Sequence, residues 1–300
     1  MYKIISNRKI WLSFSGFIVS VAIVFLALWG LNLGIDFTGG SLLEVKFNNF
    51  ETNTSDIKTQ LEDLNLSSLS VQETENDSYI LKFKDDNDVT HKEILGSLEL
   101  LPQDVESSLE ELRFDSVGPS IGDELKSKSF NAIILVLIII VLYIALVFKK
   151  VSKPVASWKY GITAIIALFH DVIITLGVFA ILGHVMNLEI NTPFVAAILT
   201  VLGYSVNDTI IVFDRIRENL PKSNDSFSTT VNTSVNQTIT RSINTSVTTL
   251  LVLGAILIWG GANIQEFILA LVIGIFIGTY SSIFLASPLL VVWEKLARKK

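Results

Sequence analysis

The sequence predicts an α-helical membrane protein with six transmembrane helices and an α+β domain inserted between the first and the second. Half of the 300 residues are hydrophobic, only 17% are charged, and the mean hydropathy is +0.54. Residues 32–129 carry 21 acidic and 8 basic side chains, a net charge of −13, whereas the rest of the chain has a net charge of +7. A soluble domain has about 25% charged residues. The composition therefore excludes a wholly soluble enzyme and a disordered chain.

Six stretches are apolar enough to cross a bilayer, which requires about 20 consecutive apolar residues. They are Ile10–Leu31, Phe130–Phe148, Tyr160–Leu182, Thr192–Phe213, Ile243–Gly261 and Phe267–Trp293. The first is longer than the apolar core of a signal peptide and has no small-x-small cleavage site after it, so we expect an uncleaved anchor. These spans divide the chain into residues 1–31, the inserted domain 32–129, helices two to six at 130–293, and a basic tail at 294–300.

The basic residues predict the orientation of the helices. All 15 basic residues outside the inserted domain lie in the N-terminus, the second-to-third loop, the fourth-to-fifth connection and the tail. The alternate loops, Gly183–Asn191 and Ala262–Glu266, contain none. Short cytoplasmic loops are enriched in Lys and Arg. We therefore expect both termini to be cytoplasmic and residues 32–129 to lie outside.

Short alternating and amphipathic segments predict an α+β fold for the inserted domain. The predicted strands are Leu42–Phe47, Tyr79–Phe83 and a third near Leu112–Val117, and the predicted helices are Ser55–Leu64 and Thr90–Leu98, with Ser55 and Thr90 as N-caps. The carboxylates of the domain are scattered, which is typical of a solvated acidic surface rather than of a binding pocket.

Several classes of site are not expected from the composition. The chain has no cysteine, which excludes disulfides and thiolate chemistry, and its three histidines are far apart in sequence. No basic face is large enough for a nucleic-acid partner, and no Walker A string or nucleophile elbow occurs. We therefore predict no cofactor, no metal ion and no enzymatic activity.

Ionisable residues inside the spans are the main functional candidates, because a charge in the bilayer is costly. Asp171 follows His170 in the third span, Asp208 follows Asn207 in the fourth, and Arg241 opens the fifth. Helical spacing places two polar stripes on neighbouring helices: Thr200, Tyr204, Asn207 and Asp208 on the fourth, and Arg241, Asn244, Thr245 and Thr248 on the fifth. We expect these stripes to face each other or a water-filled path.

A carboxyl group in such a place can act as a proton relay. Desolvation favours its neutral form, whereas a nearby guanidinium favours its charged form. Asp208 and Arg241 could instead form a buried pair that only fixes helix register, and Arg241 could extend to the cytoplasmic interface. For Asp171 a structural role and a functional role are both open, and His170 is either a proton carrier or a hydrogen-bonded core residue.

Six short strings give the sequence a resemblance to a known family. They are Gly-Ile-Asp-Phe-Thr-Gly-Gly at 34–40, Val-Gly-Pro-Ser-Ile-Gly at 117–122, His-Asp-Val at 170–172, Gly-Tyr-Ser-Val-Asn-Asp-Thr-Ile-Ile-Val-Phe-Asp-Arg-Ile-Arg-Glu at 203–218, Arg-Ser-Ile-Asn-Thr-Ser at 241–246 and Gly-Thr-Tyr-Ser-Ser at 278–282. With them, over essentially its whole length, the chain resembles the SecF members of the SecD/SecF family of protein-export membrane proteins, within the RND superfamily.

The resemblance implies an RND-type half-bundle with a ferredoxin-like external domain, in the cytoplasmic membrane of a bacterium. SecD would supply the matching half beside the SecYEG channel, and the pair would use inward proton flow to pull a translocating unfolded polypeptide across. In proteins of this family the Asp of the Asn-Asp-Thr string and the Arg of the Arg-Ser string are tied to proton conduction. At the matching positions this sequence has Asp208 and Arg241.

We expect protonation of Asp208 to release Arg241 and shift the helices, with the first two spans carrying the shift to the external domain. The conformational ranges of glycine and proline favour hinges at two links, Gly39–Gly40 on the first and Gly118, Pro119 and Gly122 on the second. Two other interpretations remain open: half of an RND-type small-molecule exporter, and a passive scaffold, which would not need an ionisable group at position 208.

Overall fold

The structure is a computed structural model that describes residues 1–74, 78–84, 88–101, 108–148, 157–261 and 264–298. The chain forms two compact units. The α+β unit comprises Leu33–Ser129, and the helical unit comprises Met1–Asn32 together with Phe130–Lys300.

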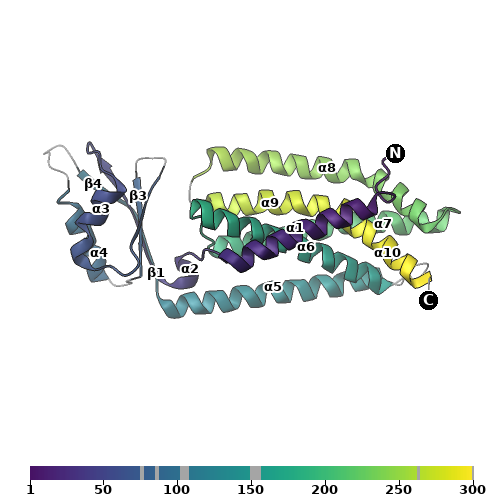
Figure 1. Cartoon of the computed structure of the whole chain (residues 1–300), viewed down its shortest axis with the longest axis horizontal. Helices are drawn as coiled ribbons and strands as arrows, with labels where there is room; N and C mark the ends of the chain where they lie inside the picture. The colour runs from purple at the N-terminus through teal and green to yellow at the C-terminus, as the bar shows by residue number, and fades with distance from the viewer. Residues whose placement is uncertain (75–77, 85–87, 102–107, 149–156, 262–263, 299–300) are drawn as a thin grey trace. The chain divides into compact units, whose positions relative to one another are not determined.

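Long helices make up the helical unit (Figure 1). They are α1 (Arg8–Trp29), α5 (Pro119–Val147), α6 (Ser157–Met186), α7 (Thr192–Asn219), α8 (Phe227–Trp259), α9 (Gln265–Ser281) and α10 (Ser287–Arg298). The π-helical segment Ser282–Ala286 joins α9 to α10 without a break. Among the residues that the structure describes, six helices are long and apolar enough to cross a membrane, counting α9 and α10 as one, and this confirms the prediction from the sequence.

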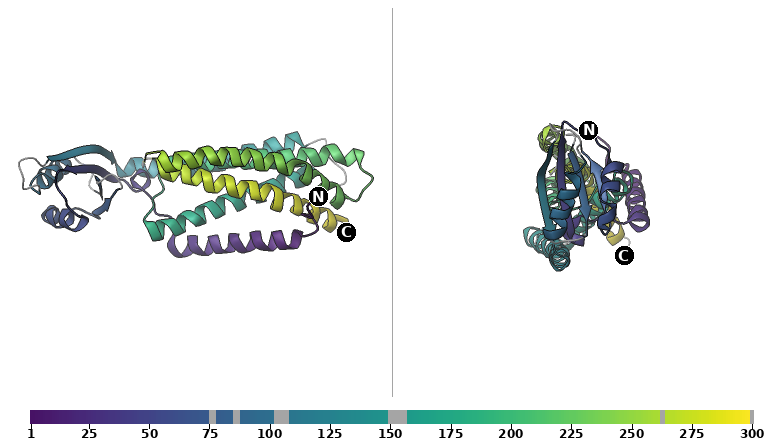
Figure 2. Two further views of the ribbon diagram at one scale, coloured as in Figure 1. Left: turned by 90° about the horizontal axis from the view of Figure 1, so that it is seen from above. Right: turned by 90° about the vertical axis from the view of Figure 1, so that its left-hand side faces the viewer.

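The helices differ in how much of their apolar surface the chain itself covers. In α6, α7 and the α9–α10 helix, about half of the most apolar 18-residue stretch is buried, at 50, 50 and 56%. The corresponding values for α1, α5 and α8 are 11, 6 and 17%. The first three helices therefore form the centre of the helical unit, whose arrangement is seen from above in Figure 2. The apolar sides of α1, α5 and α8 are left for lipid or another helix to cover.

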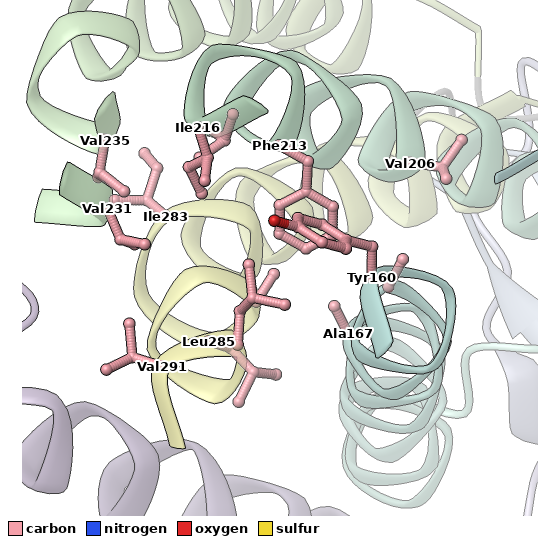
Figure 3. Packing of buried hydrophobic residues seen from close by; sticks show 14 of the residues in the cluster. Tyr160, Ala167, Val206, Phe213, Ile216, Val231, Val235, Ile283, Leu285 and Val291 are labelled. Carbon is pink, nitrogen blue, oxygen red and sulfur yellow. The ribbon is translucent and has the colours of Figure 1, made fainter. Parts of the chain in front are cut away.

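Aromatic and branched side chains fill the core of the helical unit (Figure 3). Tyr160 stacks on Phe148, with ring centroids 5.4 Å apart, and meets Phe213 edge to face. Val231 and Val235, both fully buried, lie in the same cluster. The four-residue spacing of apolar side chains over residues 226–241 predicts a cytoplasmic helix that lies against the bilayer or the bundle. The structure forms this helix as the first half of α8, continuous with the apolar segment that follows, and its apolar side packs into the bundle.

The α+β unit has the ferredoxin-like order of elements, βαββαβ. Its strands are β1 (Gly40–Asn48), β2 (Ser70–Glu73), β3 (Ser78–Phe83) and β4 (Ser108–Val117), and its helices include α2 (Ile35–Thr38), α3 (Thr54–Gln60) and α4 (Asp88–Leu98). The sheet has the order β2-β3-β1-β4 and every neighbouring pair is antiparallel. Ile57 of α3 and Ile94 of α4 pack against Leu43 and Leu81 of the sheet. The predicted fold class is confirmed.

Local details of this unit differ from the prediction. Helix α3 is capped by Asn53, whose Oδ1 accepts hydrogen bonds from the backbone of Ser55 and Asp56, so the predicted cap at Ser55 is wrong. Helix α4 begins at Asp88, two residues before the predicted Thr90. Strand β2 was not predicted, because it is only four residues long and buries one side chain, Val71.

Candidate functional site

Asp171 is the centre of a buried cluster that joins three helices. It is fully buried on α6, and its Oδ2 accepts hydrogen bonds from the hydroxyls of Ser205 on α7, at 2.5 Å, and Ser281 on α9, at 2.8 Å. Its Oδ1 lies 2.9 Å from Nδ1 of His170. The Asp171 carboxyl group therefore links α6, α7 and α9 at one point along the bundle.

Asp208 is also buried, with 1% of its surface exposed, but its surroundings differ. The Ser242 hydroxyl and the Arg241 guanidinium, both on α8, lie near its carboxyl group. Neither Oδ2 of Asp208 nor Oγ of Ser242 completes a hydrogen bond within the described part of the chain. A buried polar atom without a partner is costly. Asp208 is thus a carboxyl group whose hydrogen bonding the chain leaves incomplete.

Several members of the two polar stripes are exposed, so the stripes are not closed against each other within the chain, and the predicted alternative of a water-filled path stays open. Asn207 and Thr200 on α7 are exposed, as are Arg241 and Thr248 on α8. Among the described residues, no ion pair joins Asp208 to Arg241. The stripes instead form an open polar surface along α7 and α8, with Asp208 buried beside it. We call Thr200, Asn207, Arg241, Asn244, Thr245 and Thr248 the open polar surface.

Hydroxyl groups connect this surface to the interior. The Tyr204 hydroxyl donates to Oγ of Ser246 on α8, at 3.3 Å, and Ser246 shares a 2.6 Å hydrogen bond with Thr279 on α9. Tyr204 is one helical turn from Asp208. The sequence did not single out Ser205, Ser246, Thr279 or Ser281 as site residues. The available signals were the three-residue spacing of Ser205 and Asp208 and the Gly-Thr-Tyr-Ser-Ser string.

The predicted hinge residues lie together in the α+β unit. Gly39 has φ of +71°, and a Cβ atom there would lie 2.9 Å from Cα of Pro119. A Cβ atom on Gly122 would lie 3.1 Å from the backbone nitrogen of Gly39. Gly118 accepts the first hydrogen bonds of α5, from the backbone of Ile121 and Gly122. Gly40 has φ of +125°, and its backbone approaches the Phe83 carbonyl. The start of α5 and the end of α2 are therefore in close backbone contact.

Metal ligands are not assembled in the part of the chain that the structure describes. No three His, Cys, Asp or Glu side chains come close enough there to hold an ion. The described side chains of the site are two buried carboxyl groups, the His170 imidazole, a guanidinium and several hydroxyls.

Two family models match the chain. Residues 98–296 match the model of the C-terminal region of the protein export membrane proteins SecD and SecF, and residues 25–49 match the SecD/SecF GG motif. The second match contains Gly39 and Gly40.

Curated relatives match over nearly the full length. The protein translocase subunit SecF of Thermobaculum terrenum is 41% identical, over 98% of this chain and 94% of its own. SecF of Desulfurispirillum indicum is 39% identical, over 93% of this chain and 88% of its own.

Solved structures show the same fold. A crystal structure of SecDF from Thermus thermophilus, described as a translocon-associated membrane protein, superposes with a TM-score of 0.83 at 32% identity and covers 98% of this chain. SecDF in a super-membrane-facing form gives a TM-score of 0.70 at 32% identity and covers 99% of this chain. The chain spans 39% of the length of each SecDF chain. The chain therefore belongs to the SecD/SecF family of protein-export membrane proteins, as a member of its SecF branch.

Proposed function

We propose that this multi-pass export protein is the SecF half of a proton-driven device that promotes late steps of polypeptide export. The observation that carries the proposal is Asp208, buried with incomplete hydrogen bonding beside an exposed Arg241. An ionisable group in a membrane span is a functional hypothesis by default. Protonation of Asp208 removes its attraction to Arg241, and the return of the charge restores it.

The partner of the open polar surface is SecD, whose matching helices would cover Asn207 and Arg241. The guanidinium of Arg241 and the threonine hydroxyls beside it are costly to expose to lipid. We therefore expect a second half with a polar surface to cover them. The likeness to SecDF, in which a sequence like this one is a part of a longer chain, supports the same pairing. The SecYEG channel and the unfolded passenger polypeptide complete the proposed assembly.

The proposed orientation puts both termini in the cytoplasm of a bacterium and the α+β unit outside, on the strength of the basic residues. Protons then enter from the outer face. One charge that moves through 100 mV is worth about 2.3 kcal/mol. That free energy is enough to bias two arrangements of packed helices.

In this proposal Asp171 also responds to the protonation of Asp208. Ser205, which donates to Asp171, lies on the turn of α7 that precedes Asp208. A shift of that turn would change the contact between Ser205 and Asp171. The second carboxyl group would then respond to protonation of the first.

The glycine contact at the start of α5 is proposed to transmit the movement, and substitution of Gly39 by Ala tests this role. We expect a lower rate of export with no change in the melting temperature of the helical unit. The reason is that the new Cβ would meet the Pro119 backbone at a positive φ, which costs about 1–2 kcal/mol. Gly96→Ala in α4, where nothing lies within 4 Å, is the control. Full export by Gly39→Ala would contradict the role.

Gradient-dependent export in inside-out membrane vesicles tests the function itself. Vesicles that contain this chain, SecD and SecYEG should complete export faster when a proton gradient is present, and a protonophore should remove the gain. Vesicles without this chain should show no gain. Efflux of small molecules without SecYEG would favour an exporter instead. A gain that persists with the protonophore would favour a passive scaffold.

A further inference from the structure

A groove of about 410 Å³ lies at the end of the helical unit that carries the N-terminus. Its walls come from the residues before α1 and from the beginning of that helix, from α8 and from the π-helical segment. Trp11, Ile243 and Phe284 make its body apolar, and Trp11 packs on Phe284 with ring centroids 4.4 Å apart. A volume of this size falls within the range of roughly 300–1,000 Å³ that is usual for small-molecule sites.

The N-terminal segment is fixed beside this groove by two asparagines of α8. Asn236 accepts a hydrogen bond from the backbone nitrogen of Tyr2, at 2.7 Å, and donates one to the Tyr2 carbonyl, at 3.0 Å. Asn232 accepts from the backbone nitrogen of Ile5, at 3.1 Å, and also donates to the Tyr2 carbonyl. Ile4 and Ile5 are buried in the core. Lys3, between these anchors, is therefore held at the groove rather than on a loose end.

The polar part of the groove's lining carries a positive charge. Lys3 lines the groove together with the polar side chains of Asn7 and Thr240, and none of the described residues that line it is acidic. Lys3 forms no ion pair with any residue that the structure describes. Arg8 and Lys9 lie five and six residues further along the chain and do not line the groove. An apolar body with a basic, hydrogen-bonding polar part matches a molecule that has an anionic head and a hydrocarbon tail.

We propose that this groove binds an anionic phospholipid, with its phosphate at Lys3 and an acyl chain along Ile243 and Phe284. Basic clusters at the ends of membrane helices attract anionic headgroups, and an apolar groove between such helices suits a lipid chain. Thr240 and Ile243 flank Arg241 on α8, so the bound lipid would contact the turn that carries this residue. The inference rests on membrane insertion and is independent of proton coupling.

Native mass spectrometry of the purified full chain provides the test, with phosphatidylglycerol, phosphatidylcholine of identical acyl chains, and inorganic phosphate as probes. We expect phosphatidylglycerol to be retained over phosphatidylcholine. Lys3→Glu should lower its retention about fivefold or more, and Ile243→Trp, which fills the groove at a partly exposed position, should do the same. Lys9→Glu is the matched control, because Lys9 is exposed and does not line the groove.

Three results would overturn the proposal. Equal losses in Lys3→Glu and Lys9→Glu would reduce the effect to general surface charge. Binding of inorganic phosphate as tight as that of phosphatidylglycerol, with no effect of Ile243→Trp, would leave an anion site without a lipid chain. Loss of phosphatidylglycerol when the chain is purified with its SecD partner would show that protein, not lipid, covers the groove. Because no outcome depends on export, failure here would leave the proposed function intact.

Discussion

Replacement of Asp208 by Asn should abolish the gradient-dependent part of export while the chain still folds. Asn has nearly the same shape as Asp but cannot take up or release a proton. A charge that crosses 100 mV contributes about 2.3 kcal/mol, which corresponds to about a fifty-fold bias between two arrangements. The gain in export rate on energising inside-out vesicles should therefore fall to the level seen with a protonophore.

Asp214→Asn is the matched control for this experiment. Asp214 lies on the same helix, but its side chain is 64% exposed, and its only ion pair among the described residues is a 3.6 Å contact with Arg217. We expect this variant to export at the normal rate. Asp208→Glu, which keeps an ionisable group, should retain part of the gain. Full gradient-dependent export by Asp208→Asn would rule out the relay.

The position of Asp208 within a long apolar helix could be predicted from the sequence, because the bilayer imposes a rule on the length and polarity of the helices that cross it. A run of about 20 apolar residues must form a helix there, and a carboxyl group within it is conspicuous. The same reasoning placed six spans correctly. It could not place Asn207 and Arg241 on an open surface, because helical periodicity groups residues on a face but does not say which other helix that face meets.

The serine partners of Asp171 could not be predicted for a related reason. Serine and threonine hydroxyls in a helix commonly bond to the carbonyl one turn earlier, as Thr175 does to Asp171. Nothing in the local pattern distinguishes Ser205, which instead reaches across to another helix. In the α+β unit, the sequence likewise could not distinguish Asn53 from Ser55 as the N-cap of α3, because both residue types cap helices well.

Replacement of Asp171 by Ala should destabilise the helical unit. The variant leaves the hydroxyl of Ser205 without its acceptor in the core and breaks the link from α6 to α9 through Ser281. Hydrogen bonds between membrane helices average about 0.6 kcal/mol, whereas an unsatisfied buried donor costs about 1–3 kcal/mol. Ser281 can still donate to the Gly278 carbonyl, at 3.1 Å. We expect a loss of about 2–4 kcal/mol, measured as a lower melting temperature in detergent micelles.

Asp171→Asn separates the structural role of this residue from a role in proton transfer. The amide oxygen of Asn can accept the hydroxyls of Ser205 and Ser281 as the carboxylate oxygen does, so the melting temperature should stay close to normal. The amide cannot exchange a proton, however. If Asp171 takes part in the relay, this stable variant should lose gradient-dependent export as Asp208→Asn does. Normal export by a stable Asp171→Asn variant would mean that Asp171 only ties α6, α7 and α9 together, and that the proton path runs through Asp208 and the partner half alone.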